Sequence, residues 1–236
     1  MPILKNPNLE MLESAVHYLG SLNDRLVYLG GCASGLLLTD PAAPPLRVTR
    51  DVDVMVEVAS LADYHRLHAE LREKGFTEDL GDRAPICRWK MENLILDIMP
   101  TDPSILGFGN RWFSMAFREA EPLSLPSGAQ IRILTAPYFL ATKLETFDCR
   151  GEGDYLMSRD MEDVITVLDG RESIVSEVQA ANSTLRRYLA KRFSTLLETQ
   201  SFLDSLPGYL PPDEASQLRS RHVLERAKAI AGSDSQ

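Results

Sequence analysis

Apolar residues recur at helical spacing near the start of the chain, and this periodicity predicts an amphipathic helix. Its apolar positions are Leu9, Leu12, Val16 and Leu19. The run LVYLGG at 26–31 is typical of a short β-strand that ends in two glycines, Gly30 and Gly31. The following CASGLLL favours a helix, so this segment predicts a strand, a glycine turn and a helix in succession.

Strand-forming and helix-forming segments continue to about residue 135. A proline-rich loop, TDPAAPPLRV, precedes a strand expected at 51–57, and the segment 61–75 predicts a helix that ends at Gly75. Further strands are expected in FTEDL, ICRWKM and LILDIMP, and RWFSMAF is a short aromatic segment. IRILT at 131–135 is the last expected strand.

From Ala136 onward the pattern becomes helical. PYFLATKLETF predicts a helix, RGEGDY a glycine-rich hinge, SRDMEDVITVLDG a second helix, and long helices follow to about residue 230. The change of character predicts an α/β (α+β) domain over 1–134 and a helical domain over 135–236.

Composition describes a folded globular chain. Its 236 residues are 44% hydrophobic and 25% charged, values ordinary for such proteins. No stretch approaches the ~20 apolar residues that span a bilayer, and the N-terminus has no secretory signal pattern, so we expect a cytoplasmic protein with no membrane partner. The three cysteines (Cys32, Cys87 and Cys149) are widely spaced without a CxxC motif, which favours reduced structural thiols.

The net charge of −9 argues against a general nucleic-acid coating surface. Basic residues gather on two predicted helices, and solvated helix faces are the favoured interpretation of both. These residues are Arg186, Arg187, Lys191 and Arg192 on the first helix, and Arg219, Arg221, Arg226 and Lys228 on the second.

Two acids lie within the apolar run TRDVDVMV at 49–56. Residues i and i+2 of a strand face the same side, so Asp51 and Asp53 are expected to point together, away from the valines between and after them. Like charges this close repel each other. The pair therefore requires a cation or water beside it.

A third acid, Asp97, lies in the middle of the apolar run LILDIMP. Burying a lone carboxylate is costly unless it is paired or coordinated. Three carboxylates from two neighbouring strands suit a hard divalent cation such as Mg²⁺, with a nucleotide completing the coordination. This chemistry indicates phosphoryl or nucleotidyl transfer. At the glycine turn, Gly30 and Gly31 would let a phosphate approach the backbone, and Ser34 would add a hydroxyl.

Together these residues resemble the DNA polymerase β-like nucleotidyltransferase superfamily: Gly30-Gly31, then Asp51-Val52-Asp53, then Asp97 on a later strand. The segment ATKLETFDCRGEGDYLMSRDMEDVITVL resembles the helical segment of AbiEii-type nucleotidyltransferases, the toxin components of abortive-infection and toxin–antitoxin systems. The resemblance covers about residues 25–170. It implies a polymerase β-like core with a mixed sheet, followed by a helical domain that contributes to the nucleotide site.

The resemblance also implies residue roles. Asp51, Asp53 and Asp97 would bind Mg²⁺ or Mn²⁺, and Asp97 would help to deprotonate the acceptor hydroxyl. Lys143 would neutralise charge on the triphosphate. The nucleotide-binding set would be Gly30, Gly31, Ser34, Lys143, Arg150 and Asp160. Many family members have Gly-Ser at the turn, so Gly31 departs from the pattern and leaves the phosphate contact to the backbone or Ser34.

Each role outside the acids has a simpler alternative. Asp160 and Asp163 would suit a helix N-terminus without any site, Lys143 a helix surface, and Arg150 a loop.

Three functions follow as hypotheses. The first is transfer of a nucleoside monophosphate from an NTP to a hydroxyl acceptor, such as the end of an RNA or tRNA, by a toxin with an antitoxin partner. The second is the same chemistry on a small molecule of the antibiotic type, whose positive charge would fit an acidic protein. The third is a non-catalytic nucleotide-binding module.

Overall fold

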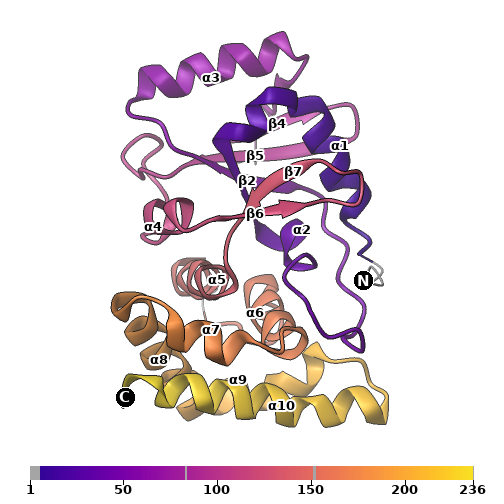
Figure 1. The fold of residues 1–236 in the computed structure, drawn as a ribbon, viewed down its shortest axis with the longest axis vertical. Helices are drawn as coiled ribbons and strands as arrows, with labels where there is room; N and C mark the ends of the chain where they lie inside the picture. Colours follow the sequence, from indigo (N-terminus) through magenta and orange to yellow (C-terminus); the bar gives the residue numbers. More distant parts are fainter. Residues whose placement is uncertain (1–5, 83, 151–152, 236) are drawn as a thin grey trace. The chain divides into compact units, whose positions relative to one another are not determined.

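The computed structural model describes residues 6–82, 84–150 and 153–235, and the chain divides into two compact units (Figure 1). The sheet unit comprises Asn6–Gly35 and Arg47–Thr135. The helical unit comprises Leu36–Leu46 together with the chain from Ala136 onward. The sequence placed a single boundary between residues 134 and 135; the structure also assigns the proline-rich segment Leu36–Leu46 to the helical unit.

The sheet unit is built on one mixed, seven-stranded sheet in the order β3-β4-β5-β2-β1-β7-β6. The pairs β2–β5 and β1–β7 are parallel, and the other neighbours are antiparallel. This arrangement confirms the α/β class and the mixed sheet. The elements are α1 Leu9–Leu19, η1 Gly20–Arg25, β1 Leu26–Leu29, α2 Gly30–Ser34, β2 Val52–Val56, α3 Leu61–Glu73, β3 Thr77–Glu78, β4 Arg88–Met91, β5 Leu94–Pro100, α4 Phe113–Arg118, β6 Glu121–Ser124 and β7 Gln130–Ile133.

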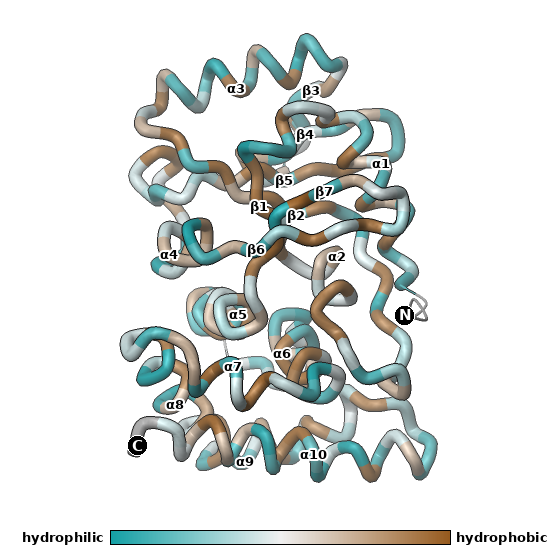
Figure 2. Tube along the Cα trace, viewed as in Figure 1, coloured by the Kyte–Doolittle hydropathy of each residue, from teal (hydrophilic) through white to brown (hydrophobic). Residues whose placement is uncertain are grey.

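The central strands of this unit are apolar because both of their faces are largely covered (Figure 2). Helix α1 packs against β2 and β5, and Tyr64 of α3 donates a hydrogen bond to the backbone carbonyl of Ile98 at 2.7 Å. Helix α3 begins at the N-cap Ser60, whose hydroxyl accepts from the Asp63 amide at 3.2 Å. It ends just before Gly75, which has a φ of +92°. Its predicted extent is therefore confirmed to within two residues.

The helical unit contains six α-helices in the described part of the chain. Pro137 falls in the first turn of α5, where a missing amide donor costs nothing. Gly151 and Glu152 of the predicted hinge lie outside the described residues. The elements are α5 Ala136–Arg150, α6 Arg159–Gly170, α7 Ile174–Ala180, α8 Ser183–Glu198, α9 Gln200–Ser205, η2 Leu206–Tyr209, α10 Glu214–Ala231 and η3 Gly232–Ser235.

The segment Leu36–Leu46 is anchored to the C-terminal end of α6. The amides of Thr39 and Asp40 both donate to the Gly170 carbonyl, at 2.8 and 2.9 Å. A Cβ added at Gly170 would meet Leu38 Cδ2 at 2.9 Å, so glycine allows this close approach without a shift of the Leu38 side chain. Arg219 of α10 bridges Asp40 and the buried Asp169, which adds an ionic contact to the backbone bonds.

None of the helices in the described ranges combines the length and the apolar character needed to cross a bilayer.

Candidate active site

The two acids of neighbouring parallel strands lie directly opposite each other. Asp53 of β2 is in register with Asp97 of β5, and Asp97 is in register with Arg88 of the antiparallel neighbour β4. The three residues form one row across three adjacent strands, and residues in such a row project from the same face of a sheet. Asp51 precedes the first residue of β2, two positions before Asp53.

Arg88 lies between two of the predicted metal ligands. Its Nε donates to Asp97 Oδ1 at 2.8 Å, and its Nη2 donates to Asp97 Oδ2 at 2.7 Å and to Asp51 Oδ2 at 2.9 Å. The hydrogen bonds and charge of Asp97, followed by the charge of Asp51, raise the Arg88 pKa and keep the guanidinium charged. A positive group beside Asp51 and Asp97 is therefore present within the chain itself.

Sequence reasoning missed Arg88. The available signal was alternation in the run ICRWKM, where Trp89 is fully buried and Arg88 and Lys90 take the opposite side of β4. A basic residue on that side, one strand away from a buried acid, is a natural partner for it.

Asp53 is pressed against the glycine turn. Gly30 follows the last residue of β1, Leu29, which is in register with Asp53. A Cβ built on Gly30 would lie 1.9 Å from Asp53 Oδ2, and Gly30 has a φ of +74°. Both the conformation and the space exclude a side chain there. The glycine thus has a role within the fold, to accommodate the Asp53 carboxylate.

The rest of the predicted phosphate-binding turn is buried. The Ser34 hydroxyl donates to the Gly31 carbonyl at 2.7 Å, and both residues are buried. Helix α2 is only five residues long, so its aligned peptide dipoles are few. The phosphate-binding roles of Gly30, Gly31 and Ser34 stay predictions.

Two cysteines of the sheet unit lie close to the acids. Burial, reinforced by the charges of Asp53 and Asp97 respectively, raises the pKa of Cys32 and of Cys87 to about 12. Thiolates, not thiols, are the metal-binding form. Both groups are therefore protonated structural thiols, and all three cysteines of the chain are free, as predicted.

The donor types of the acidic row fit a hard cation. Carboxylate oxygens are the ligands that Mg²⁺ and Mn²⁺ accept in proteins, and three carboxylates carry a formal charge of −3 against +1 for Arg88. Within the described ranges, however, no group of three or more His, Cys, Asp or Glu side chains is already arranged to hold a metal ion. The three acids have the donor chemistry of a metal site, and Arg88 pairs with two of them, Asp51 and Asp97.

In the helical unit, Lys143 lies in a compact ionic cluster. Its Nζ is 3.2 Å from Asp160 Oδ1 and 2.6 Å from Asp163 Oδ2, and the side chains of Lys143, Asp160 and Asp163 are 14%, 7% and 6% exposed. Arg150, which is 70% exposed, reaches Asp160 at 3.1 Å. The structure thus brings together three residues that the resemblance placed in the nucleotide site, Lys143, Arg150 and Asp160, and adds Asp163. Two cations and two carboxylates balance one another within the cluster.

The arginine-rich helices α8 and α10 use several guanidinium groups internally. Arg192 pairs with Asp148 at 2.6 Å, and Arg219 pairs with Asp169 at 2.8 Å. Arg226 donates to backbone carbonyls at the end of α6, where cations offset unpaired acceptors. These arginines stabilise the helical unit, so the basic patches are weaker than the sequence alone indicates.

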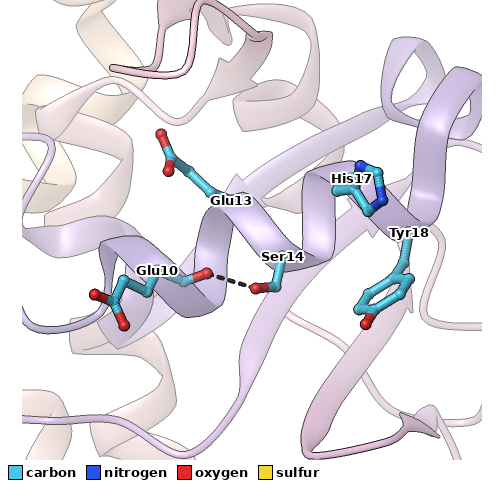
Figure 3. A pocket seen from close by; sticks show the side chains of 5 residues that line it. All are labelled: Glu10, Glu13, Ser14, His17 and Tyr18. Carbon is cyan, nitrogen blue, oxygen red and sulfur yellow. Dashed lines mark hydrogen bonds between the residues drawn. The ribbon is translucent and has the colours of Figure 1, made fainter.

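An open hollow of about 360 Å³ lies along α1 (Figure 3). Its lining residues are Glu10, Glu13, Ser14, His17 and Tyr18. The Ser14 hydroxyl donates to the Glu10 carbonyl at 2.8 Å, the bond drawn in Figure 3. None of the residues predicted to carry chemistry lines this hollow.

No protein-family model matches the chain, and no curated protein matches it. Among solved structures, the crystal structure of JHP933 from Helicobacter pylori is similar, with a TM-score of 0.50 and 12% sequence identity over 98% of this chain and 94% of that chain. At this identity the similarity shows a shared fold alone.

Proposed function

We propose that the chain is a metal-dependent nucleotidyltransferase that moves a nucleoside monophosphate from an NTP to a hydroxyl acceptor. One observation carries the proposal: Asp53 lies directly opposite Asp97 on a parallel neighbour, with Asp51 two residues away. Like charges in directly opposed positions destabilise a sheet. A sequence that keeps three acids there is best explained by a use for them, and the polymerase β-like resemblance supplies that use.

In the proposed reaction, the acceptor oxygen forms a bond to the α-phosphorus of the NTP, and the bond to the β-phosphate oxygen breaks. Pyrophosphate leaves, and the acceptor proton passes to a carboxylate of the row, for which Asp97 is the candidate. Asp51, Asp53 and Asp97 would hold Mg²⁺ or Mn²⁺, which would supply neutralisation of the triphosphate charge. For Lys143, Arg150 and Asp160 the proposal keeps the nucleotide-binding roles that the resemblance implies.

The test is transfer of label from NTPs carrying the radiolabel at the α or the γ phosphate. Label from the α position should appear on an acceptor in total RNA or in a panel of small hydroxyl compounds, and label from the γ position should not. Asp53→Ala should reduce transfer at least a hundredfold, and Asp24→Ala, which removes an exposed acid of the same unit, should leave it unchanged. Transfer that persists in Asp53→Ala would refute the assignment, and transfer of the γ label would indicate a kinase instead.

The acceptor divides the proposal in two. An RNA or tRNA acceptor fits a toxin with an antitoxin protein as its partner, which is the function that the AbiEii resemblance implies. A cationic small molecule is the second candidate, and a specific observation favours it: Arg192, Arg219 and Arg226 are engaged in internal contacts, on a chain of net charge −9.

Salt dependence separates the two acceptors. Binding that neutralises many phosphates weakens steeply as salt rises. We expect transfer to RNA to fall by more than tenfold between 50 and 200 mM NaCl if several phosphates are contacted, as is usual for such complexes. Transfer to a compound with one or two amino groups should fall much less. If Mg²⁺-NTP binds and neither acceptor class is labelled, the non-catalytic nucleotide-binding module is the better description.

A further inference from the structure

We propose that Arg88 is an internal cation that competes with a divalent metal ion for the carboxylates of Asp51 and Asp97. In the metal-free protein the guanidinium holds the two acids together, and a metal ion binds only when Arg88 releases Asp51. The inference rests on the proposed function, because it requires that the acidic row binds a metal.

The geometry shows the competition directly. One nitrogen, Nη2 of Arg88, lies 2.9 Å from Asp51 Oδ2 and 2.7 Å from Asp97 Oδ2. Mg²⁺ would require carboxylate oxygens at ~2.0–2.1 Å, closer than Nη2 lies to either acid. A metal ion held by Asp51 and Asp97 would need the oxygens that now accept from Nη2, so it could not bind them while Nη2 keeps both bonds.

Burial indicates which contact opens. The Asp97 side chain is 9% exposed, and it receives two parallel bonds from Arg88, the strong bidentate form of this pair. The Asp51 side chain is 34% exposed and receives one bond. Because water already reaches Asp51, its bond to Arg88 is the weaker of the two. Asp97 can keep the Nε bond of Arg88 at Oδ1 while Oδ2, freed from Nη2, binds a metal.

The charge of the acids favours replacement of the Arg88 guanidinium by a divalent cation. Asp51 and Asp97 together carry a formal charge of −2, which a divalent cation neutralises in full and the single charge of Arg88 only in part. Arg88 therefore has two opposed effects: it stabilises the acids without metal, and it lowers their affinity for metal by holding Asp51 and by repelling the ion. Removing it should strengthen metal binding and weaken the metal-free fold.

The first experiment is titration with Mn²⁺, followed by electron paramagnetic resonance, of the wild type, Arg88→Met and Arg25→Met. Arg25 pairs with Glu70 in the same unit, away from the acids, and is the matched control. We expect Arg88→Met to bind Mn²⁺ at least tenfold more tightly than the wild type, and Arg25→Met to bind as the wild type does. Arg88→Lys keeps the charge without the planar fork, so it should bind Mn²⁺ with intermediate affinity. If Arg88→Met folds only with metal, Arg88→Lys replaces it in the comparison with the wild type.

The second experiment follows the Arg88 Nη2–H signal, which reports the bond to Asp51, in the full-length wild-type protein by ¹⁵N NMR, assigned by its loss in Arg88→Lys. Mg²⁺ should shift this signal, while the Arg25 signal stays constant. The inference is overturned if the wild type binds Mn²⁺ and Arg88→Met binds no more tightly, or if saturating Mg²⁺ leaves the Arg88 signal unchanged. If neither protein binds Mn²⁺, the metal-dependent function itself fails. Binding by Arg88→Met alone would support the competition and overturn that function.

Discussion

The Asp53 carboxylate occupies the space where a side chain at position 30 would be, with Oδ2 only 1.9 Å from the Cβ position of Gly30. The acid of β2 and the glycine after β1 are therefore coupled, because a side chain at position 30 would require the Asp53 carboxylate to move. A glycine turn beside an acidic strand can thus have an origin in packing as well as in phosphate binding.

Gly30→Ala should destabilise the protein and displace Asp53. Gly107→Ala is the matched control, because Gly107 has a similar φ of +76° but open space around its Cβ position. Each substitution incurs the strain of a positive φ. Gly30→Ala should cost about 1–3 kcal/mol more than the control, the range for overpacking, in urea unfolding. Asp53→Ala in the same chain should recover part of that difference, and equal costs for the two alanine variants would contradict the contact.

Lys143→Met should be strongly destabilising. The change leaves the buried carboxylates of Asp160 and Asp163 without their closest cation, and breaking such a pair costs about 3–5 kcal/mol. Arg150→Met is the control, since this exposed arginine pairs with the same Asp160 and surface pairs contribute about 1 kcal/mol or less. Denaturant midpoints measure both. Adding Asp160→Asn and Asp163→Asn to Lys143→Met should restore much of the loss if charge is the cause.

Arg219→Met should loosen the segment Leu36–Leu46 from α6. Arg219 compensates Asp169, which is 2% exposed, and also pairs with Asp40, so its loss leaves a buried charge unpaired. Thermolysin should cleave at Leu37 or Leu38 at least tenfold faster than in the wild type. Arg221→Met, at an exposed position of the same helix, should not change the rate. Equal protection in both variants would show that the segment's other bonds, including those to Gly170 and from Arg171 to the Leu37 carbonyl, suffice.

His68 should make the protein less stable in mild acid. Burial lowers its pKa below the ordinary value of 6.5, and His65 and Arg72 add to this effect against the opposing charge of Glu78. As pH falls below about 6.5 the unfolded chain takes up the proton before the folded chain does, so the free energy of unfolding decreases. His68→Gln should lose less stability than the wild type between pH 7 and 5 in urea titrations. His17→Gln, at an exposed position, should lose as much as the wild type.

The sequence predicted those elements whose pattern is local. Helix α1 begins and ends at the first and last residues of the predicted repeat, Leu9 and Leu19, and β5 spans all of LILDIMP, because apolar periodicity reflects burial. Strand β6 was missed: it is an edge strand that contains Pro122 and lies mostly exposed, so no alternation marks it. Helix α4 was recognised only as an aromatic segment.

The candidate site was predictable to a similar degree. A buried acid such as Asp97 is conspicuous in an apolar strand, whereas its alignment with Asp53 depends on the register of β2 with β5. The contact of Arg88 with Asp97 could not be predicted from a local pattern, because it depends on which strand lies beside β5. The close packing of Gly30 against Asp53 likewise depends on the register of β1 with β2. Contacts of this kind exist only once the sheet is assembled.

The anchoring of Leu36–Leu46 has a consequence for synthesis of the chain. The Leu37 carbonyl accepts from Arg171, 134 positions later in the chain, and Asp40 accepts from Arg219, 179 positions later. During translation this segment therefore leaves the ribosome early, and it can form all of these contacts only when nearly the whole chain has been synthesised. A fragment that stops at residue 135 would contain every strand of the sheet and still present an unsatisfied loop. Expressing either unit alone thus requires removal of this loop or its transfer to the other unit, not a single cut.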